Sequence, residues 1–124
     1  MAAATARTVR PLSVLVVEDD PLLRLAAVSA LEDAGLEVLE AACADDALAL
    51  LLDRDGVDVL FTDVDMPGGM DGMQLATMVG FRWPSTRLLV TSGGLPPAER
   101  GYGRLGDFLP KPYRDETVVA RVLG

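Results

Sequence analysis

Acidic side chains stand directly after two apolar stretches of the sequence. Glu18 and Asp19 follow the first stretch, and Asp63 follows a later one. Carboxylates held close together in a partly desolvated site repel one another, so such a group needs a cation or raised pKa values. Mg²⁺ accepts carboxylates, a backbone carbonyl, waters and a phosphate oxygen. The pattern therefore predicts a magnesium site in which one carboxylate could act as a nucleophile.

Further polar groups follow two other apolar stretches. The hydroxyls of Thr91 and Ser92 end one stretch, and Lys111 stands between two prolines after another. An amine supplies positive charge and a hydroxyl supplies a hydrogen-bond donor, so together they could hold a phosphoryl group beside the carboxylates. Phosphoryl transfer depends chiefly on positioning and charge neutralisation. The absence of histidine from the sequence therefore does not oppose this chemistry.

The stretches that position these residues alternate between strand and helix patterns. Strands are expected at residues 12–17, 36–42, 57–62, 87–91 and 107–109. Helices are expected from Pro21 to a stop at Gly35, from a cap at Asp45 or Asp46 to Gly56, from Gly72 to Trp83, and from about Asp115 onward. Apolar side chains predict the buried face of the first helix: Leu23, Ala27, Ala30, Leu31 and Ala34.

This alternation predicts an α/β fold with a five-stranded parallel sheet and right-handed crossovers. Because the polar residues all follow strands, they should gather at one edge of the sheet, where such folds bind ligands. Prolines and glycines between Leu95 and Gly106 predict a short or mobile fourth helix. We expect one domain at residues 11–124, preceded by a flexible tail at residues 1–10.

Composition excludes several other classes of protein. The net charge is −8 at pH 7 and the 11 Lys and Arg residues are scattered, whereas nucleic-acid surfaces need clustered basic side chains. Without histidine, zinc sites ligated by His and phosphohistidine chemistry on this chain are excluded. The lone Cys43 allows no internal disulfide, and no apolar run is long enough for a membrane span. We expect a cytoplasmic protein with neither nucleic acid nor membrane as partner.

From about residue 11 to its end, the sequence resembles the receiver domain of two-component response regulators. The matching elements, in order, are Glu18-Asp19, Asp63, Met66-Pro67, Asp71-Gly72, the hydroxyl at residue 91 or 92, and Lys111-Pro112. The resemblance implies a flavodoxin-like, doubly wound sheet with strand order 2-1-3-4-5. It places the site between the first and third strands, at the switch in strand order.

The resemblance also implies a role for each acidic residue. Asp63 would take a phosphoryl group from a histidine kinase or a phosphotransfer protein of a phosphorelay. Asp19 and Asp63 would bind Mg²⁺ through their carboxylates, and Asp65 through its backbone carbonyl. Glu18 would act through a metal-bound water.

Three further residues would sense the phosphoryl group. Lys111 would pair with it, and the bond from Lys111 to Pro112 would be cis. Ser92 would donate a hydrogen bond to it, with Thr91 as the alternative. Phe108 would change rotamer as the Ser92 loop closes, although a purely structural role in the core is nearly as well supported. Signalling to a downstream protein target would then pass through the surface around Leu95–Tyr113.

Two other functions remain open from the sequence. Asp63-Val64-Asp65 imitates the nucleophile and acid pair of haloacid dehalogenase phosphatases, but that motif normally ends the first strand of a longer chain. The chain could also be an interaction module that keeps the fold without phosphorylation, although every expected site residue is present. We expect a complete single-domain regulator rather than a piece of a hybrid kinase.

Overall fold

The computed structural model describes residues 10–101 and 105–124. Its elements, in order, are β1 (Ser13–Val17), α1 (Pro21–Asp33), β2 (Glu37–Ala41), α2 (Ala44–Arg54), β3 (Val59–Asp63), α3 (Gly72–Arg82), β4 (Arg87–Ser92), the 3₁₀ helix η2 (Pro97–Arg100), β5 (Asp107–Pro110) and α4 (Asp115–Leu123). The expected strands are confirmed, with ends that differ by at most two residues. Residues 1–9 of the expected tail lie outside the described residues.

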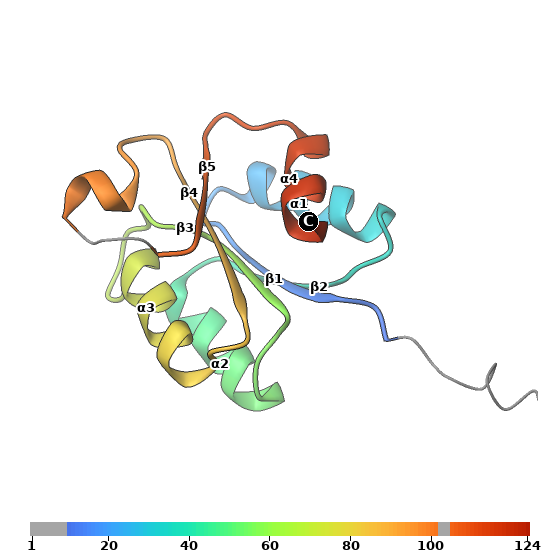
Figure 1. The fold of residues 1–124 in the computed structure, drawn as a ribbon, viewed down its shortest axis with the longest axis horizontal. Coiled ribbons are helices and arrows are strands. Elements are labelled where there is room, and N and C mark those ends of the chain that lie inside the picture. Colours follow the sequence, from blue (N-terminus) through green and yellow to red (C-terminus); the bar gives the residue numbers. More distant parts are fainter. Residues whose placement is uncertain (1–9, 102–104) are drawn as a thin grey trace, which may run out of the picture.

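The five strands form one parallel sheet in the order β2-β1-β3-β4-β5, as expected. Helices α1 and α4 cover one face of this sheet, and α2 and α3 cover the other (Figure 1). In this order β1 and β3 are neighbours whose following loops lead to opposite faces. Their carboxyl ends therefore open onto the crevice where doubly wound sheets bind ligands.

The two central strands are buried on both faces. Val14 and Val16 of β1 pack in the cluster with α1 and α4, whereas Leu15 and Val17 pack in the cluster with α2 and α3. All five residues of β3 are buried as well. Helices on both sides of a parallel sheet explain why these strands show apolar runs without alternation.

Two local expectations about the helices are wrong. The buried residues of α1 are Ala27, Val28 and Leu31, whereas Ala30 is only partly buried and Ala34 is exposed. Leu23 is 38% exposed and lines a hollow beside the loop that follows β5. Helix α2 begins at Ala44 with Cys43 as a cap that makes no side-chain bond. Asp45 and Asp46 instead occupy the first turn, where a carboxylate interacts favourably with the helix dipole.

Helix α3 begins where expected and packs closely on the end of β3. Asp71 caps it, because its carboxylate accepts from the Gln74 amide at 2.8 Å while the Gln74 side chain accepts from the Asp71 amide at 3.0 Å. A Cβ placed at Gly72 would lie 1.9 Å from the Asp63 carbonyl oxygen. Glycine is therefore what lets the first turn of α3 approach the backbone of Asp63.

The segment between β4 and β5 contains one turn of 3₁₀ helix, η2, in its described part. This confirms the expected short fourth helix, so the label α4 belongs to the last helix of the chain. Gly101 ends η2 with a φ of 85°, a conformation that favours glycine. Residues 102–104 of the segment lie outside the described residues.

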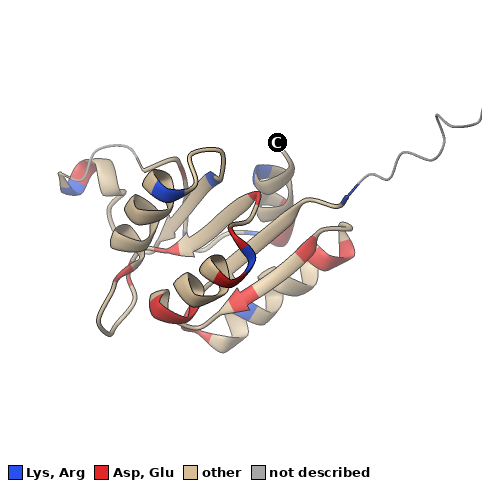
Figure 2. Cartoon of the chain, turned by 90° about the horizontal axis from the view of Figure 1, so that it is seen from below, with Lys and Arg blue, Asp and Glu red and all other residues tan. Residues whose placement is uncertain are grey.

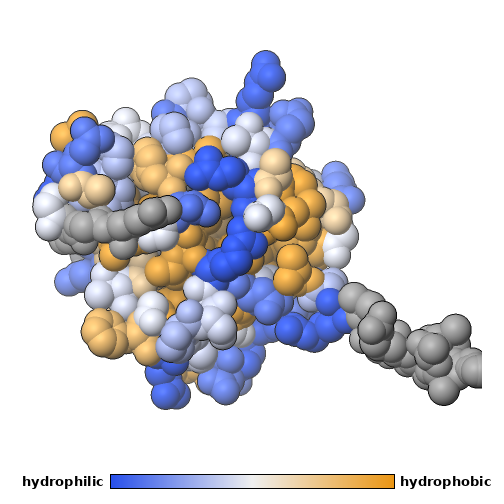
Figure 3. Space-filling model, in the orientation of Figure 1, coloured by the Kyte–Doolittle hydropathy of each residue, from blue (hydrophilic) through white to orange (hydrophobic). Residues whose placement is uncertain are grey.

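Charge and hydropathy are distributed unevenly over the surface. Figure 2 shows Lys and Arg scattered singly over the described elements, while Asp and Glu are more frequent. Figure 3 shows one face, on which hydrophilic side chains separate two apolar areas. In residues 10–101 and 105–124, no helix combines the length and apolar character needed to cross a membrane.

Candidate functional site

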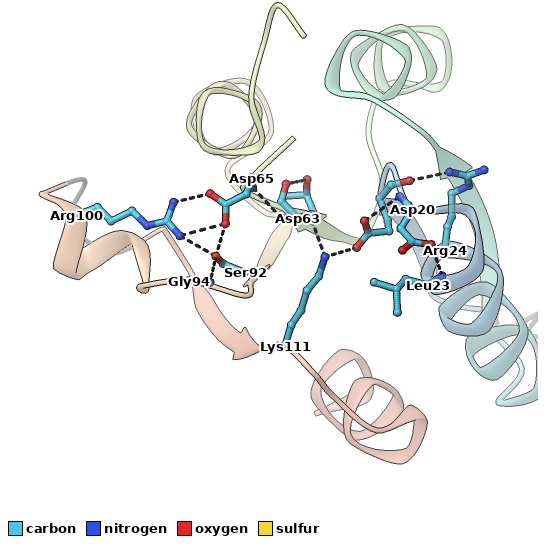
Figure 4. Close-up of polar contacts among 11 residues, drawn as sticks. Asp20, Leu23, Arg24, Asp63, Asp65, Ser92, Gly94, Arg100 and Lys111 are labelled. Atoms are coloured by element: carbon cyan, nitrogen blue, oxygen red, sulfur yellow. Dashed lines mark hydrogen bonds and ion pairs between the residues drawn. The ribbon is translucent and has the colours of Figure 1, made fainter. Parts of the chain in front are cut away.

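Three strands deliver charged side chains to one place at the carboxyl edge of the sheet. Lys111, directly after β5, lies with its Nζ 2.6 Å from Oδ2 of Asp63 at the end of β3 and 2.7 Å from Oε1 of Glu18 after β1 (Figure 4). The expected convergence of these three residues is thus present in the structure. The bond between Lys111 and Pro112 is cis, as the resemblance implied.

The two carboxylates of this cluster are buried. The side chains of Glu18 and Asp63 are 4% and 5% exposed, and that of Lys111 is 19% exposed. Burial raises the pKa of the Glu18 carboxyl, although the ion pair with Lys111 acts in the opposite direction. Burial alone would lower the pKa of Lys111, but its bonds to Asp63 and Glu18 outweigh this and raise it. These contacts therefore favour the charged form of Lys111 between the two carboxylates.

The carboxylates also form a set of oxygen donors suited to a divalent cation. Carboxylate oxygens of Glu18, Asp19 and Asp63 lie within 4.8 Å of one another, and Asp19 is the exposed member of the three. Lys111 supplies one positive charge against these acids, so negative charge remains uncompensated. Hard oxygen donors with room for water on the exposed side fit Mg²⁺.

The turn after β3 is fixed by the phosphoacceptor candidate itself. The Asp65 backbone amide donates to Oδ1 of Asp63 at 2.8 Å, an Asx-turn that folds the chain back on its own side chain. The other carboxylate oxygen, Oδ2, faces Lys111. The two oxygens of Asp63 are therefore held in different environments.

The two adjacent hydroxyls of β4 have different surroundings. Ser92 donates to the Asp65 carboxylate, and its oxygen accepts from the Gly94 amide at 2.9 Å (Figure 4). The Thr91 hydroxyl is buried and has no hydrogen-bond partner among the described residues. Of the two, Ser92 is the hydroxyl that meets side chains at the site.

Arg100 joins the site although no sequence pattern marked it. From η2, its Nη1 lies 2.6 Å from Oδ1 of Asp65, and its Nη2 lies 3.1 Å from Oδ2. The Nη2 group also donates to the Ser92 hydroxyl at 2.7 Å. The Arg100 guanidinium holds the pKa of the Asp65 carboxyl below its usual value. The one related sequence signal is Pro97, which favours the first position of a helical turn and so marks where η2 begins, but not what Arg100 contacts.

Phe108 of β5 lies away from the carboxylates. It is partly buried against the cluster of Val64, Met73, Ala76 and Val90. It also lines a cavity of about 300 Å³ together with Pro96 and Pro97 of the η2 segment. Space for a change of rotamer therefore lies beside the ring, and the change itself remains a prediction.

The sequence is similar to one family of known proteins over most of its length. The response regulator receiver domain family matches residues 14–123. The chain is 35% identical over 109 residues, or 82% of its length, to the sensor kinase CckA of Brucella abortus, of which it spans 11%. It is 43% identical over 106 residues, or 83% of its length, to the two-component response regulator ARR11 of Arabidopsis thaliana, of which it spans 20%.

Solved structures show the same relationship. The chemotaxis response regulator CheY4 of Vibrio cholerae is 30% identical and superposes with a TM-score of 0.79, covering 91% of this chain and 97% of that one. The receiver domain of the hybrid histidine kinase CckA is 33% identical with a TM-score of 0.75, covering 90% of this chain and 95% of that one. The family match, extending over nearly the whole described fold, shows that the chain belongs to the response regulator receiver domains.

Proposed function

We propose that this receiver domain takes a phosphoryl group onto Asp63 from the phosphohistidine of a histidine kinase or phosphotransfer protein. The observation that supports this most directly is the buried Asp63 carboxylate, 2.6 Å from the amine of Lys111 and beside two further carboxylates. In the reaction, a carboxylate oxygen of Asp63 forms a bond to phosphorus as the phosphorus–nitrogen bond of the donor breaks. The donor imidazole keeps the electron pair of that bond and takes a proton from water.

Mg²⁺ is the cofactor that the donor set fits. The carboxylates of Asp19 and Asp63 and the backbone carbonyl of Asp65 would hold it, and Glu18 would reach it through a water. When bound, Mg²⁺ supplies positive charge to the phosphoryl oxygens. The amine of Lys111 would then move from the carboxylate to a phosphoryl oxygen, which keeps its charge paired throughout.

The response would begin at the strand β4 hydroxyl. Ser92 would donate to a phosphoryl oxygen, and Phe108 would follow the movement of this loop into the cavity beside it. A downstream protein target would recognise the changed surface around Leu95–Tyr113. With a histidine kinase or phosphotransfer protein as donor and a protein as target, the domain would act in the cytoplasm.

The proposal is tested with purified protein, Mg²⁺ and acetyl phosphate, read by intact mass. We expect uptake of one phosphoryl group per chain, with no uptake when EDTA is added before acetyl phosphate and none in Asp63→Asn. Asp58→Asn is a matched control, because it makes the same change at a carboxylate on the far edge of the sheet. No uptake by folded protein would favour an interaction module without phosphorylation. Steady turnover of phosphate monoesters would instead favour the phosphatase.

A further inference from the structure

The Ser92 hydroxyl has no hydrogen-bonding capacity left in this structure. A serine hydroxyl offers one donor and two acceptor positions. Its proton is donated to the Asp65 carboxylate, and its oxygen accepts from the Gly94 amide and from Arg100. To donate to a phosphoryl group on Asp63, the Ser92 hydroxyl must therefore first break its hydrogen bond to the Asp65 carboxylate.

Arg100 fixes the carboxylate that holds this proton. Its guanidinium contacts both oxygens of Asp65, and its Nε donates to the Leu95 carbonyl at 2.7 Å. A bidentate contact of this kind fixes the orientation of the carboxylate as well as pairing its charge. It also neutralises an acid that stands two residues from Asp63, where a free negative charge would oppose phosphorylation. Asp65, Arg100 and Ser92 thus form one connected unit between β3, β4 and η2.

We infer that Asp65 and Arg100 are positioning residues that hold the Ser92 hydroxyl away from Asp63 until phosphorylation competes for its proton. The inference rests on the proposed function, since it concerns the response of that same site. The two anions, the Asp65 carboxylate and the phosphoryl group, compete for one donor. The strength of the Asp65 contact therefore sets how far phosphorylation shifts the domain toward its active arrangement.

Removal of the Asp65 carboxylate should raise the affinity of the site for a phosphoryl group or its mimic. In Asp65→Ala the Ser92 hydroxyl is free to turn toward Asp63, while the backbone carbonyl and amide of residue 65 are retained. A hydrogen bond to a charged group at a partly exposed site corresponds to about a tenfold change in an equilibrium. Beryllofluoride, which mimics the phosphoryl group on an aspartate, should therefore bind Asp65→Ala about tenfold more tightly than the unsubstituted protein.

Removal of a negative charge near an anion site would also tighten binding, whether or not Ser92 takes part. Asp65→Ala is therefore also made in a protein that lacks the Ser92 hydroxyl, which separates the effect of charge from the effect through Ser92. Beryllofluoride affinity is measured by NMR titration at fixed Mg²⁺ in the unsubstituted protein, Asp65→Ala, Ser92→Ala and the double variant. If Asp65 acts through Ser92, Asp65→Ala tightens beryllofluoride binding about tenfold more with serine present than in the Ser92→Ala background, where only the change of charge acts. Equal tightening in both backgrounds, or no tightening in either, would overturn the inference and leave the proposed function intact.

A readout without ligand completes the test. The Gly94 amide, which donates to Ser92, should change its chemical shift in metal-free Asp65→Ala and Arg100→Ala, but not in Asp53→Ala, which removes an exposed acid of α2. An unchanged Gly94 amide in both site variants would overturn the inference. Failure of beryllofluoride to bind the folded, unsubstituted protein would overturn the proposed function and the inference with it.

Discussion

Substitution of Gly72 by alanine should damage both the stability and the site. A Cβ at this position would lie 1.9 Å from the Asp63 carbonyl oxygen and 2.6 Å from the Val64 Cα. Real Cβ atoms do not approach closer than 3.0 Å, so the backbones must separate by about 1 Å. Both neighbours are main-chain atoms at the end of β3 and just after it, and main chain cannot rotate away as a side chain would. Overpacking of this kind costs about 1–3 kcal/mol.

Gly80 provides a matched control on the same helix. A Cβ there would meet only the Leu88 side chain at 3.7 Å, an ordinary contact. Gly80→Ala should raise the free energy of unfolding by about 0.5–1 kcal/mol, because alanine loses less backbone freedom in a helix. Urea unfolding and acetyl phosphate uptake of both variants are the assays. The reasoning is refuted if Gly72→Ala unfolds at the same urea concentration as Gly80→Ala and is phosphorylated normally.

Three further outcomes are expected. Lys111→Ala should still gain phosphoryl mass, but phosphorylation should no longer change the chemical shifts of Phe108. A full change at Phe108 in this variant would contradict the proposed role of Lys111. Mg²⁺ at ten times its dissociation constant should raise the free energy of unfolding by about 1.4 kcal/mol; the same gain in Asp63→Asn would place the ion elsewhere. Asp58→Asn should cost about 1 kcal/mol at pH 7, because the carboxylate accepts from the Ser13 amide and hydroxyl at 2.8 and 3.1 Å, bonds that lower its pKa. That contribution is present above the ordinary carboxyl pKa and lost as pH falls through the lowered one, so the two proteins should converge in urea unfolding below about pH 4.

Much of the fold could be predicted because its signals are local. Apolar runs without alternation indicate strands covered on both sides, and Gly35, with a φ of 92°, marks the end of α1 as expected. Because the strands are parallel, residues that end or follow them lie at one edge of the sheet. Glu18, Asp63 and Lys111 are such residues. The strand order itself came from the family resemblance rather than from the pattern.

The parts that were missed depend on tertiary contacts. Leu23 has helical spacing like its buried neighbours, but the first turn of α1 faces a loop instead of the sheet. Arg100 contacts Asp65 across 35 positions of sequence, through a one-turn helix too short for periodicity to reveal. No sequence rule relates the side chain of such a turn to a carboxylate in the loop after β3. The contacts of Arg100 with Asp65 and Ser92 are therefore visible only in the structure.

The central claim is that Asp63 is the phosphoacceptor, and direct mapping of the phosphorylated residue tests it most directly. Protein treated with acetyl phosphate and Mg²⁺ is reduced with borohydride, which converts an aspartyl phosphate to homoserine, and its peptides are sequenced by mass spectrometry. The account predicts homoserine at position 63 and unmodified aspartate at positions 19 and 65. Homoserine at either of those positions with Asp63 intact would contradict it.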